Sequence, residues 1–232
     1  MLYPNIRRAE FLSRPNRFIA NVLLEDGTKE TVHVKNTGRC RELLVPGCTV
    51  FLCRSDNPSR KTKYDLIATE KRCADGSVLL VNMDSQIPND VAAEWLPHSG
   101  IFSGDAVFHR EYTHGNSRFD FMVQENGTQS FVEVKGCTLE NEGVCSFPDA
   151  PTERGVKHVR ELITAVQEGH GAFLLFIVQM KGMRYLVPND ATHPAFGEAV
   201  REAQKAGVKI LAVECDITPQ SIVALRPIPV VL

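Results

Sequence analysis

The hydrophobic pattern of the first third of the chain predicts a series of short strands. Apolar and polar residues alternate in five segments separated by turn-forming residues, and a period of two is typical of half-buried strands. The absence of a convincing helix among them favours a small antiparallel barrel. The OB-fold is a common nucleic-acid-binding barrel of this size, and other small barrels fit the same pattern. The expected strands cover residues 17–24, 29–35, 49–54, 64–70 and 77–82.

From about residue 85 the pattern predicts helices that alternate with strands. The first helix is expected to begin at Asn89 or Asp90, which are good N-cap residues, and to end before Pro97. The nearly continuous apolar run 172–180 is typical of a central strand, buried on both faces of a mostly parallel sheet. The other expected elements are a strand at 102–111, a hairpin at 117–136, helices at about 152–169 and 194–206, a strand at 208–214 and a tail or edge at 218–232. We therefore predict an OB-like domain, residues 1–84, and an α/β domain, residues 85–232.

Composition indicates an ordinary globular chain. Of its 232 residues, 43% are hydrophobic and 23% are charged, and no apolar run approaches the roughly 18 to 20 residues that cross a bilayer. The N-terminal segment MLYPNIRRAEF lacks the apolar part of a signal peptide, so we expect a cytoplasmic protein without membrane association. The seven cysteines include no C-x-x-C pair. This argues against structural zinc and a disulfide framework and predicts reduced, mostly half-buried thiols.

The charge is unevenly distributed along the chain. The first 80 residues carry 14 Lys and Arg against 9 Asp and Glu, whereas the remainder carries 12 against 19. This distribution suits a domain that binds phosphates next to a domain that binds metal ions. The alternative is that the charges are scattered over the surface and only solvated. Residues 36–47 are either a phosphate-binding loop, in which Arg39 and Arg41 contact the phosphate, or an ordinary connecting loop. A second basic stretch around Asn57-Pro58 is expected to be a loop, with nucleic-acid backbone contacts as its functional option; it holds Arg54, Arg60, Lys61 and Lys63.

The most informative stretch is the predicted hairpin of residues 117–136. Two apolar-rich runs flank Asn126-Gly127, the strongest short signal for a two-residue type I′ turn. Such a turn fixes the register, so that Asp120 is expected opposite Glu133 and Arg118 opposite Lys135. Because side chains alternate along strands, all four are expected on one face. The other face is then expected to carry Phe119, Phe121, Val132 and Val134.

Two opposed carboxylates repel one another, so something must offset the charge of Asp120 and Glu133. One solution is a lattice of diagonal ion pairs, in which Asp120 contacts Lys135 and Arg118 contacts Glu133. The other is a divalent cation held between the two carboxylates, with Lys135 beside it to activate water or stabilise negative charge. The hairpin alone leaves both solutions open.

The helix that follows the hairpin carries a polar stripe at helical spacing. Arg154, Lys157, His158 and Glu161 recur at i, i+3, i+4 and i+7, and such a stripe either faces water or extends a site from the hairpin. Five other histidines are not spaced along the sequence as metal ligands are, so we predict no metal role for them. They are His33, His98, His109, His170 and His193. Nucleotide-binding glycine loops, a nucleophile elbow and an H-E-x-x-H motif are absent from the sequence.

The order of elements and the D…E-x-K pattern resemble the PD-(D/E)XK nuclease superfamily. A narrower resemblance, to the sugar fermentation stimulation protein A family, runs over essentially the whole chain. The motifs that carry it are NTGR with ELLVPG, SRFDF, EVKG, FPDAPTERGVKH and GVKILA. The departures are His114, where an aromatic residue is expected, and Cys137, where an aliphatic residue is expected.

This resemblance implies an N-terminal OB-like barrel followed by a nuclease-like, mixed-sheet α/β/α domain, with DNA binding and a bacterial regulatory role in sugar use. Asp120 and Glu133 would then bind Mg²⁺ or Mn²⁺ with the carbonyl of Val134. Lys135 would position or deprotonate water, and Glu111 would complete a second metal or water shell. Arg154 and the helix N-terminus would hold phosphate. The phosphate contacts expected are Arg39, Arg41, Arg118, Arg154, Lys157 and His158, supported by Asp149 and Glu153. The alternatives are simple helix capping for Asp149 and a solvated carboxylate at a strand end for Glu111.

The sequence thus favours a DNA-binding, divalent-metal-dependent nuclease. A regulator of sugar metabolism genes that binds DNA without turnover is the alternative. A metal-dependent enzyme acting on RNA or on a small phosphoester is a third option, since only the basic first part of the chain points to a polymer as the substrate. A homodimer is one option for the oligomeric state.

Overall fold

The N-terminal barrel is built from five strands and closed by a parallel pair. The computed structural model describes residues 1–36, 38–57, 59–115 and 117–232, so the predictions for Thr37 and Pro58 lie outside the described residues. Strand β3 pairs with β5, which closes the order β3-β2-β1-β4-β5, and β6 extends the sheet beyond β5. The strands are β1 (Ile6–Asn16), β2 (Ile19–Leu24), β3 (Lys29–Val34), β4 (Thr49–Arg54), β5 (Tyr64–Arg72) and β6 (Val78–Asn82).

Strand β1 is the main element of the barrel that the sequence pattern did not predict. It pairs with β2 on one side and with β4 on the other, so the barrel could not close without it. Its inward positions include Ala9 and Phe11, which are buried, whereas Arg7, Arg8 and Glu10 are exposed. Two adjacent charged residues, Arg7 and Arg8, obscure the apolar alternation in the sequence.

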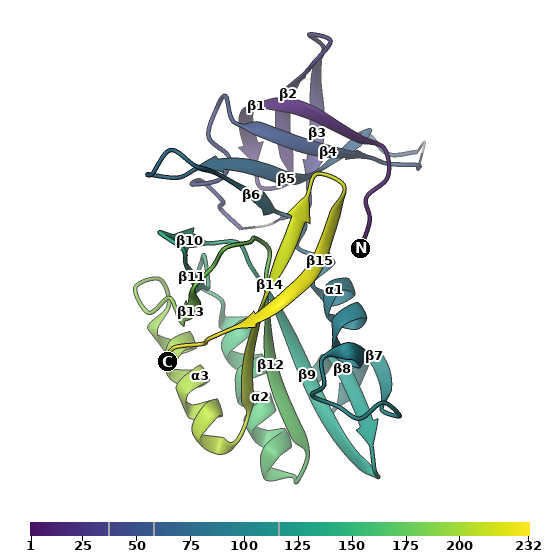
Figure 1. Cartoon of the computed structure of the whole chain (residues 1–232), viewed down its shortest axis with the longest axis vertical. Coiled ribbons are helices and arrows are strands. Elements are labelled where there is room, and N and C mark those ends of the chain that lie inside the picture. Colours follow the sequence, from purple (N-terminus) through teal and green to yellow (C-terminus); the bar gives the residue numbers. More distant parts are fainter. Residues whose placement is uncertain (37, 58, 116) are drawn as a thin grey trace.

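The C-terminal domain is a six-stranded mixed sheet with helices on both faces (Figure 1). The order is β15-β14-β12-β9-β8-β7, and β12 lies centrally between two parallel neighbours, as its apolar run predicts. Helix α1 covers one face, and α2 and α3 cover the other. The strands are β7 (Val107–His114), β8 (Ser117–Glu125), β9 (Thr128–Cys137), β12 (Gly171–Val178), β14 (Lys209–Thr218) and β15 (Ser221–Ile228); the helices are α1 (Ile87–Trp95), α2 (Glu153–Gln167) and α3 (Pro194–Ala206).

Several smaller elements complete this domain. A 3-10 turn, η1 (Leu96–His98), follows α1 directly. A three-stranded sheet beside the main one, which the sequence did not predict, consists of β10 (Glu140–Asn141), β11 (Val144–Phe147) and β13 (Tyr185–Pro188). The expected tail or edge after residue 218 forms the antiparallel edge strand β15. The predicted fold class, an OB-like barrel followed by a mixed-sheet α/β domain, is therefore confirmed.

The barrel lies against one end of the C-terminal sheet through a buried polar junction (Figure 1). The Gln179 side chain, which is 1% exposed, donates to the backbone carbonyls of Asn82 and Asp84. Gly136 packs so tightly on this amide and on Pro88 that a Cβ atom would lie 2.5 Å and 2.7 Å from them, respectively. The glycine after Lys135 is therefore required by the junction.

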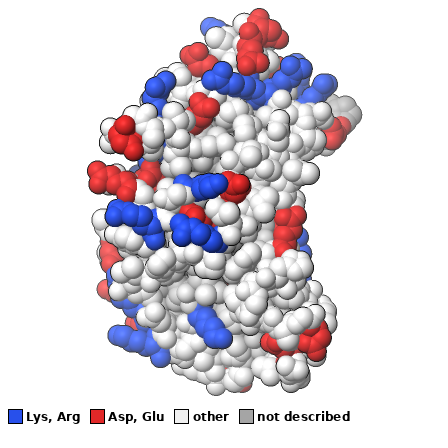
Figure 2. Space-filling view, viewed as in Figure 1, with Lys and Arg blue, Asp and Glu red and all other residues white. Residues whose placement is uncertain are grey.

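The distribution of charged side chains and the burial of the cysteines agree with the predictions in part. Figure 2 shows Lys and Arg side chains gathered across the barrel below an acidic group at its tip, with both signs mixed over the C-terminal domain. All seven cysteines are free, as expected. Four of them are fully buried instead of half-buried: Cys40, Cys137, Cys145 and Cys215. Among the described residues, no helix is long and apolar enough to cross a membrane.

Candidate functional site

The hairpin of β8 and β9 has the register that its turn predicts. Asn126 and Gly127 both have positive φ, 49° and 76°, as a type I′ turn requires. The strands pair from Glu125 opposite Thr128 to Phe121 opposite Val132. The pairing stops one residue short of Asp120 and Glu133, and both side chains line one cleft.

At Asp120 the regular ladder gives way to a side-chain contact. The Asp120 carboxylate accepts the Val134 backbone N–H at 2.7 Å and the Asn89 side-chain amide at 2.7 Å. The prediction that Phe119 and Phe121 share a face is wrong for this reason. Phe119 packs toward α2 and Phe121 toward α1, so β8 turns between them, at Asp120, and continues to Ser117 paired with β7 alone.

Glu133 is almost completely buried, with 3% of its side chain exposed. Its Oε1 atom accepts hydrogen bonds from Lys135 Nζ and from His158 Nδ1. Its Oε2 atom is buried and, among the residues that the structure describes, has no hydrogen-bond partner. A buried charged oxygen in this state is unusual, because native proteins pair nearly all such atoms.

These residues line one cleft with a volume of about 200 Å³, which we call the Asp120 cleft. Strands β7, β8 and β9 form its base, and α1 and α2 supply its rims. Its lining consists of Ser85, Asn89, Glu111, Arg118, Phe119, Asp120, Glu133, Val134, Lys135, Arg154 and His158. The structure therefore brings together seven of the twelve predicted site residues.

The two carboxyl groups have opposite pKa shifts. Burial raises the pKa of Asp120, and the negative charge of Glu133 raises it further, against the hydrogen bond from Val134. Burial also acts to raise the pKa of Glu133, but the hydrogen bond from His158 and the charge of Lys135 together lower it. Glu133 is therefore ionised at neutral pH, and ionised Asp120 is held at an energetic cost.

The predicted lattice of diagonal ion pairs is not what the structure contains. Lys135 pairs with Glu133, its near neighbour on β9, while Arg118 pairs with Glu111 at 3.0 Å. Glu111 has a positive φ of 57°, which is rare for a residue with a side chain. Glu111 lies at the mouth of the cleft, and about half of its side chain is exposed.

Helix α2 contributes two of its predicted residues to the cleft. Thr152 caps the helix by accepting the Gly155 N–H at 3.0 Å. Arg154 Nε donates to His158 Nε2 at 3.3 Å, so that nitrogen is unprotonated and the His158 proton lies on Nδ1, directed at Glu133. Arg154 thereby sets the tautomer of the histidine that holds Glu133.

The other predicted residues of this region lie elsewhere. Lys157 faces solvent and pairs with Glu161 at 3.6 Å, within α2. Glu153 points away from the cleft to His193, at 3.1 Å. Asp149 lies in the turn before α2, against the barrel loop that contains Gly38. These three do not line the cleft.

Arg39 and Arg41 line a separate surface groove of about 450 Å³ on the barrel, with Arg14 and Arg17. Both predicted residues are exposed. Arg14, which the sequence analysis did not single out, shapes the loop by donating hydrogen bonds to four backbone carbonyls, those of Arg17, Asn36, Gly38 and Arg39. In the second basic stretch, Arg60 is engaged by Asp65 and Lys63 by Glu30.

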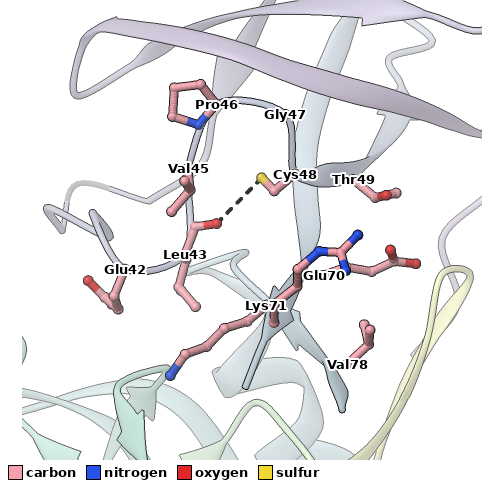
Figure 3. A pocket seen from close by; sticks show the side chains of 11 residues that line it. Glu42, Leu43, Val45, Pro46, Gly47, Cys48, Thr49, Glu70, Lys71 and Val78 are labelled. Atoms are coloured by element: carbon pink, nitrogen blue, oxygen red, sulfur yellow. Dashed lines mark hydrogen bonds between the residues drawn. The ribbon is translucent and has the colours of Figure 1, made fainter. Parts of the chain in front are cut away.

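The ELLVPG segment forms another cavity, of about 400 Å³ (Figure 3). The Cys48 thiol donates to the Leu43 carbonyl across its wall, and the Lys71 side chain extends from β5 toward the C-terminal domain. There Lys71 pairs with Glu140. In this segment a hydrogen bond closes the loop, and Lys71 at the cavity wall makes a contact between the domains.

Two residues of the Asp120 cleft were missed by sequence reasoning, Ser85 and Asn89. The helix was expected to begin at Asn89 or Asp90, whereas it begins at Ile87 with Gln86 as its N-cap residue. Asn89 lies inside the first turn and donates its amide to Asp120 instead of capping. Pro88 was the available signal, because proline favours the first turn of a helix.

Comparison with known proteins identifies the family. Residues 12–81 match the family model described as SfsA N-terminal OB domain, and residues 86–221 match that described as Sugar fermentation stimulation protein RE domain. This chain belongs to the sugar fermentation stimulation protein family. A sugar fermentation stimulation protein homolog from Desulfitobacterium hafniense (strain Y51) is 57% identical over 224 residues, which cover 97% of this chain and 95% of that protein.

More distant relatives cover the chain equally well. A homolog from Clostridium beijerinckii is 48% identical over 222 residues, with 96% of each chain covered. The solved structure titled SfsA of Pyrococcus furiosus in complex with Ca²⁺ is 25% identical and covers 100% of this chain and 98% of its own, with a TM-score of 0.84. The two-domain architecture is therefore shared with this solved relative.

Proposed function

We propose that this chain is a DNA-binding protein whose C-terminal domain hydrolyses phosphodiester bonds with a divalent metal ion. The observation that carries this proposal is the state of Glu133. Its Oε2 atom is buried and unpaired among the described residues, although two donors share its Oε1 atom. Leaving a buried polar atom unpaired costs about 1–3 kcal/mol, and more if it is charged. A divalent cation in the cleft would satisfy this atom.

The donors of the Asp120 cleft fit Mg²⁺ or Mn²⁺. Asp120, Glu133 and the carbonyl of Val134 supply only oxygen, which these hard cations prefer. Burial and then the charge of Glu133 raise the pKa of Asp120, and a bound cation would offset both effects. The Pyrococcus furiosus relative, which was solved in complex with the hard cation Ca²⁺, adds support from within the family.

The remaining cleft residues suit phosphodiester hydrolysis. The bound ion would neutralise the phosphate and lower the pKa of a water molecule. Lys135, of which 17% is exposed, reaches into the cleft and would position that water. Arg154 and Arg118 lie at its rims, where guanidinium groups would hold the flanking phosphates. His158 fixes Glu133 in place.

The barrel supplies the proposed DNA-binding surface. Its groove presents the exposed side chains of Arg39 and Arg41 beside Arg14 and Arg17. Such a row of guanidinium groups suits the phosphate backbone, which dominates the affinity of most DNA-binding proteins. Glu111 remains a candidate for the water shell at the mouth of the cleft.

A second candidate function is DNA binding without turnover. One observation favours it: Lys135 and His158 already offset the charge of Glu133 without a metal. In that case the cleft would be a structural ion-pair network retained by a gene regulator. The proposed nuclease and this regulator differ in their requirement for Asp120.

The direct test incubates the purified protein with single-stranded and duplex DNA, in Mg²⁺ or Mn²⁺, beside the Asp120→Ala variant. RNA and a small phosphodiester are included as alternative substrates. Asp216→Ala is the matched control, because Asp216 is a half-exposed aspartate paired with Lys181 at the surface. We expect cleavage by the wild type and the control but not by Asp120→Ala. Equal cleavage by all three would exclude this site.

Metal titration separates the two candidates. Calorimetry with Mn²⁺ should show one site that is lost in Glu133→Gln, and this substitution keeps the size of the side chain. If the protein is a regulator without turnover, the Asp120→Ala and Glu133→Gln variants should bind DNA with unchanged affinity. Such a protein should also show no Mn²⁺ site that depends on Glu133.

A further inference from the structure

A second group of metal-ligating side chains lies outside the Asp120 cleft. His114, Glu168 and His170, which we call the His114 cluster, each place a ligand atom within 4.8 Å of the other two. His114 ends β7, Glu168 follows α2 as its C-cap residue, and His170 immediately precedes β12. Glu168 is ten residues beyond His158 along α2, or about 15 Å at the rise of an α-helix. The cluster is therefore distinct from the cleft.

The two imidazole rings are held in place by a buried aromatic residue. Phe131 is completely buried, and its ring centroid lies 4.5 Å from that of His114 and 5.2 Å from that of His170. The two imidazole rings meet at 85° with centroids 5.1 Å apart. Because packing fixes both rings, binding of an ion would cost little of their conformational entropy.

The electrostatics at the cluster favour a cation. Glu168 lies at the C-terminus of α2, where the helix dipole is negative, and the last turn of α2 contains no basic residue. A carboxylate is disfavoured at that end of a helix. Glu168 Oε2 lies 2.7 Å from His114 Nε2, its hydrogen-bond partner. An ion bound between them would offset both the carboxylate and the helix terminus.

We propose that the His114 cluster binds a divalent transition-metal ion of the Zn²⁺ class. Two imidazole nitrogens and one carboxylate oxygen are a borderline ligand set that suits Zn²⁺, unlike the all-oxygen set of the Asp120 cleft. The side chains of His114 and Glu168 are 30% and 49% exposed, so solvent can supply the remaining ligand.

The site needs only a small adjustment. Tetrahedral zinc with bonds of about 2.1 Å places its ligand atoms about 3.4 Å apart. His114 Nε2 and Glu168 Oε2 would therefore separate slightly from 2.7 Å, which the half-exposed Glu168 side chain can do. The ion would fasten the edge strand β7 to α2 and to the start of β12. This proposal does not depend on nuclease activity.

The test measures Zn²⁺ binding to the full chain by calorimetry in the Asp120→Ala background, which removes the oxygen site. His114→Phe removes one ligand and keeps an aromatic ring on Phe131. His109→Phe is the matched control, since His109 is an exposed histidine on the same strand. We expect the control to bind one more equivalent of Zn²⁺ than His114→Phe. Glu168→Gln, which alters only an exposed side chain, should weaken Zn²⁺ binding by about 100-fold, at least as much as loss of a residue supporting a ligand.

Co²⁺ as a spectroscopic probe identifies the ligands. The visible bands of the bound ion should lack a thiolate charge-transfer component and should disappear in His114→Phe but persist in His109→Phe. Equal Zn²⁺ stoichiometry and affinity in the two histidine variants, or a Co²⁺ spectrum carrying thiolate charge transfer in both, would overturn the proposal.

Discussion

Gly38 and Asp149 lie so close together that a Cβ atom on residue 38 would overlap with the carboxyl group of Asp149. Gly38 belongs to the barrel loop after β3, and Asp149 to the turn before α2. The same contact affects Cys40, because burial and then the charge of Asp149 raise the pKa of its thiol to about 12. Two motifs more than 100 residues apart in sequence therefore form one junction between the domains.

We expect Gly38→Ala to lower the free energy of unfolding by about 1–3 kcal/mol, as overpacking usually does. Asp149→Ala should remove part of that cost, because it makes room for the added methyl group. The contact with Asn36 Oδ1, at 2.9 Å from the added Cβ, should account for the rest. Chemical denaturation of both single variants and the double variant measures this coupling. Strict additivity of the two substitutions would contradict the contact.

We expect Asp120→Asn to stabilise the metal-free protein at neutral pH, by about 0.5–2 kcal/mol, while abolishing cleavage. Burial and the charge of Glu133 raise the pKa of Asp120, so ionised Asp120 destabilises the folded state. That destabilisation is complete above the raised pKa and disappears as the pH falls through it to below the ordinary value.

Thermal unfolding from pH 7 to pH 3 without metal checks this expectation. The gain in stability from Asp120→Asn should shrink as the pH falls. Adding Mn²⁺ should stabilise the wild type and not the variant. A variant less stable than the wild type at pH 7 would show that the contacts of Asp120 with Val134 and Asn89 outweigh its repulsion from Glu133.

Lys135→Ala is expected to separate metal binding from turnover. Loss of a group that positions or deprotonates water should lower kcat by about 100-fold or more. Mn²⁺ affinity should stay the same or rise, because the ammonium group no longer competes for Glu133. Single-turnover cleavage and calorimetry measure the two effects, with Lys181→Ala as a surface control. Parallel loss of affinity and rate would instead assign Lys135 a role in holding the cleft together.

Local chemistry made the centre of this site predictable. The Asn126-Gly127 turn determines which residues of β8 and β9 oppose one another, so the sequence could predict that Asp120 and Glu133 lie in one cleft. The sequence did not predict the faces on which Phe119 and Phe121 lie, because β8 turns where the Asp120 side chain replaces a ladder hydrogen bond. That departure depends on tertiary contacts.

Residues contributed from distant elements were beyond the sequence pattern. Asn89 reaches Asp120 from a helix 31 residues earlier, and its polar side chain suggested a cap instead. The rings of His114 and His170 meet over the buried ring of Phe131, although β8 and β9 separate β7 from β12 in the sheet. No spacing rule connects such residues, so the prediction that His170 has no metal role rested on sequence distance alone.

Thr152→Ala should destabilise the protein by about 1 kcal/mol and also reduce cleavage. The Thr152 hydroxyl accepts the Gly155 N–H at 3.0 Å and closes the first turn of α2, and Ala removes that acceptor. Arg154 and His158 lie on this turn and the next, so loosening it should weaken the support of Glu133. Thr152→Ser keeps the hydroxyl and is the control, measured by urea denaturation and by cleavage with Mn²⁺. If Ala and Ser behave alike in both measurements, the cap does not position the cleft residues of α2.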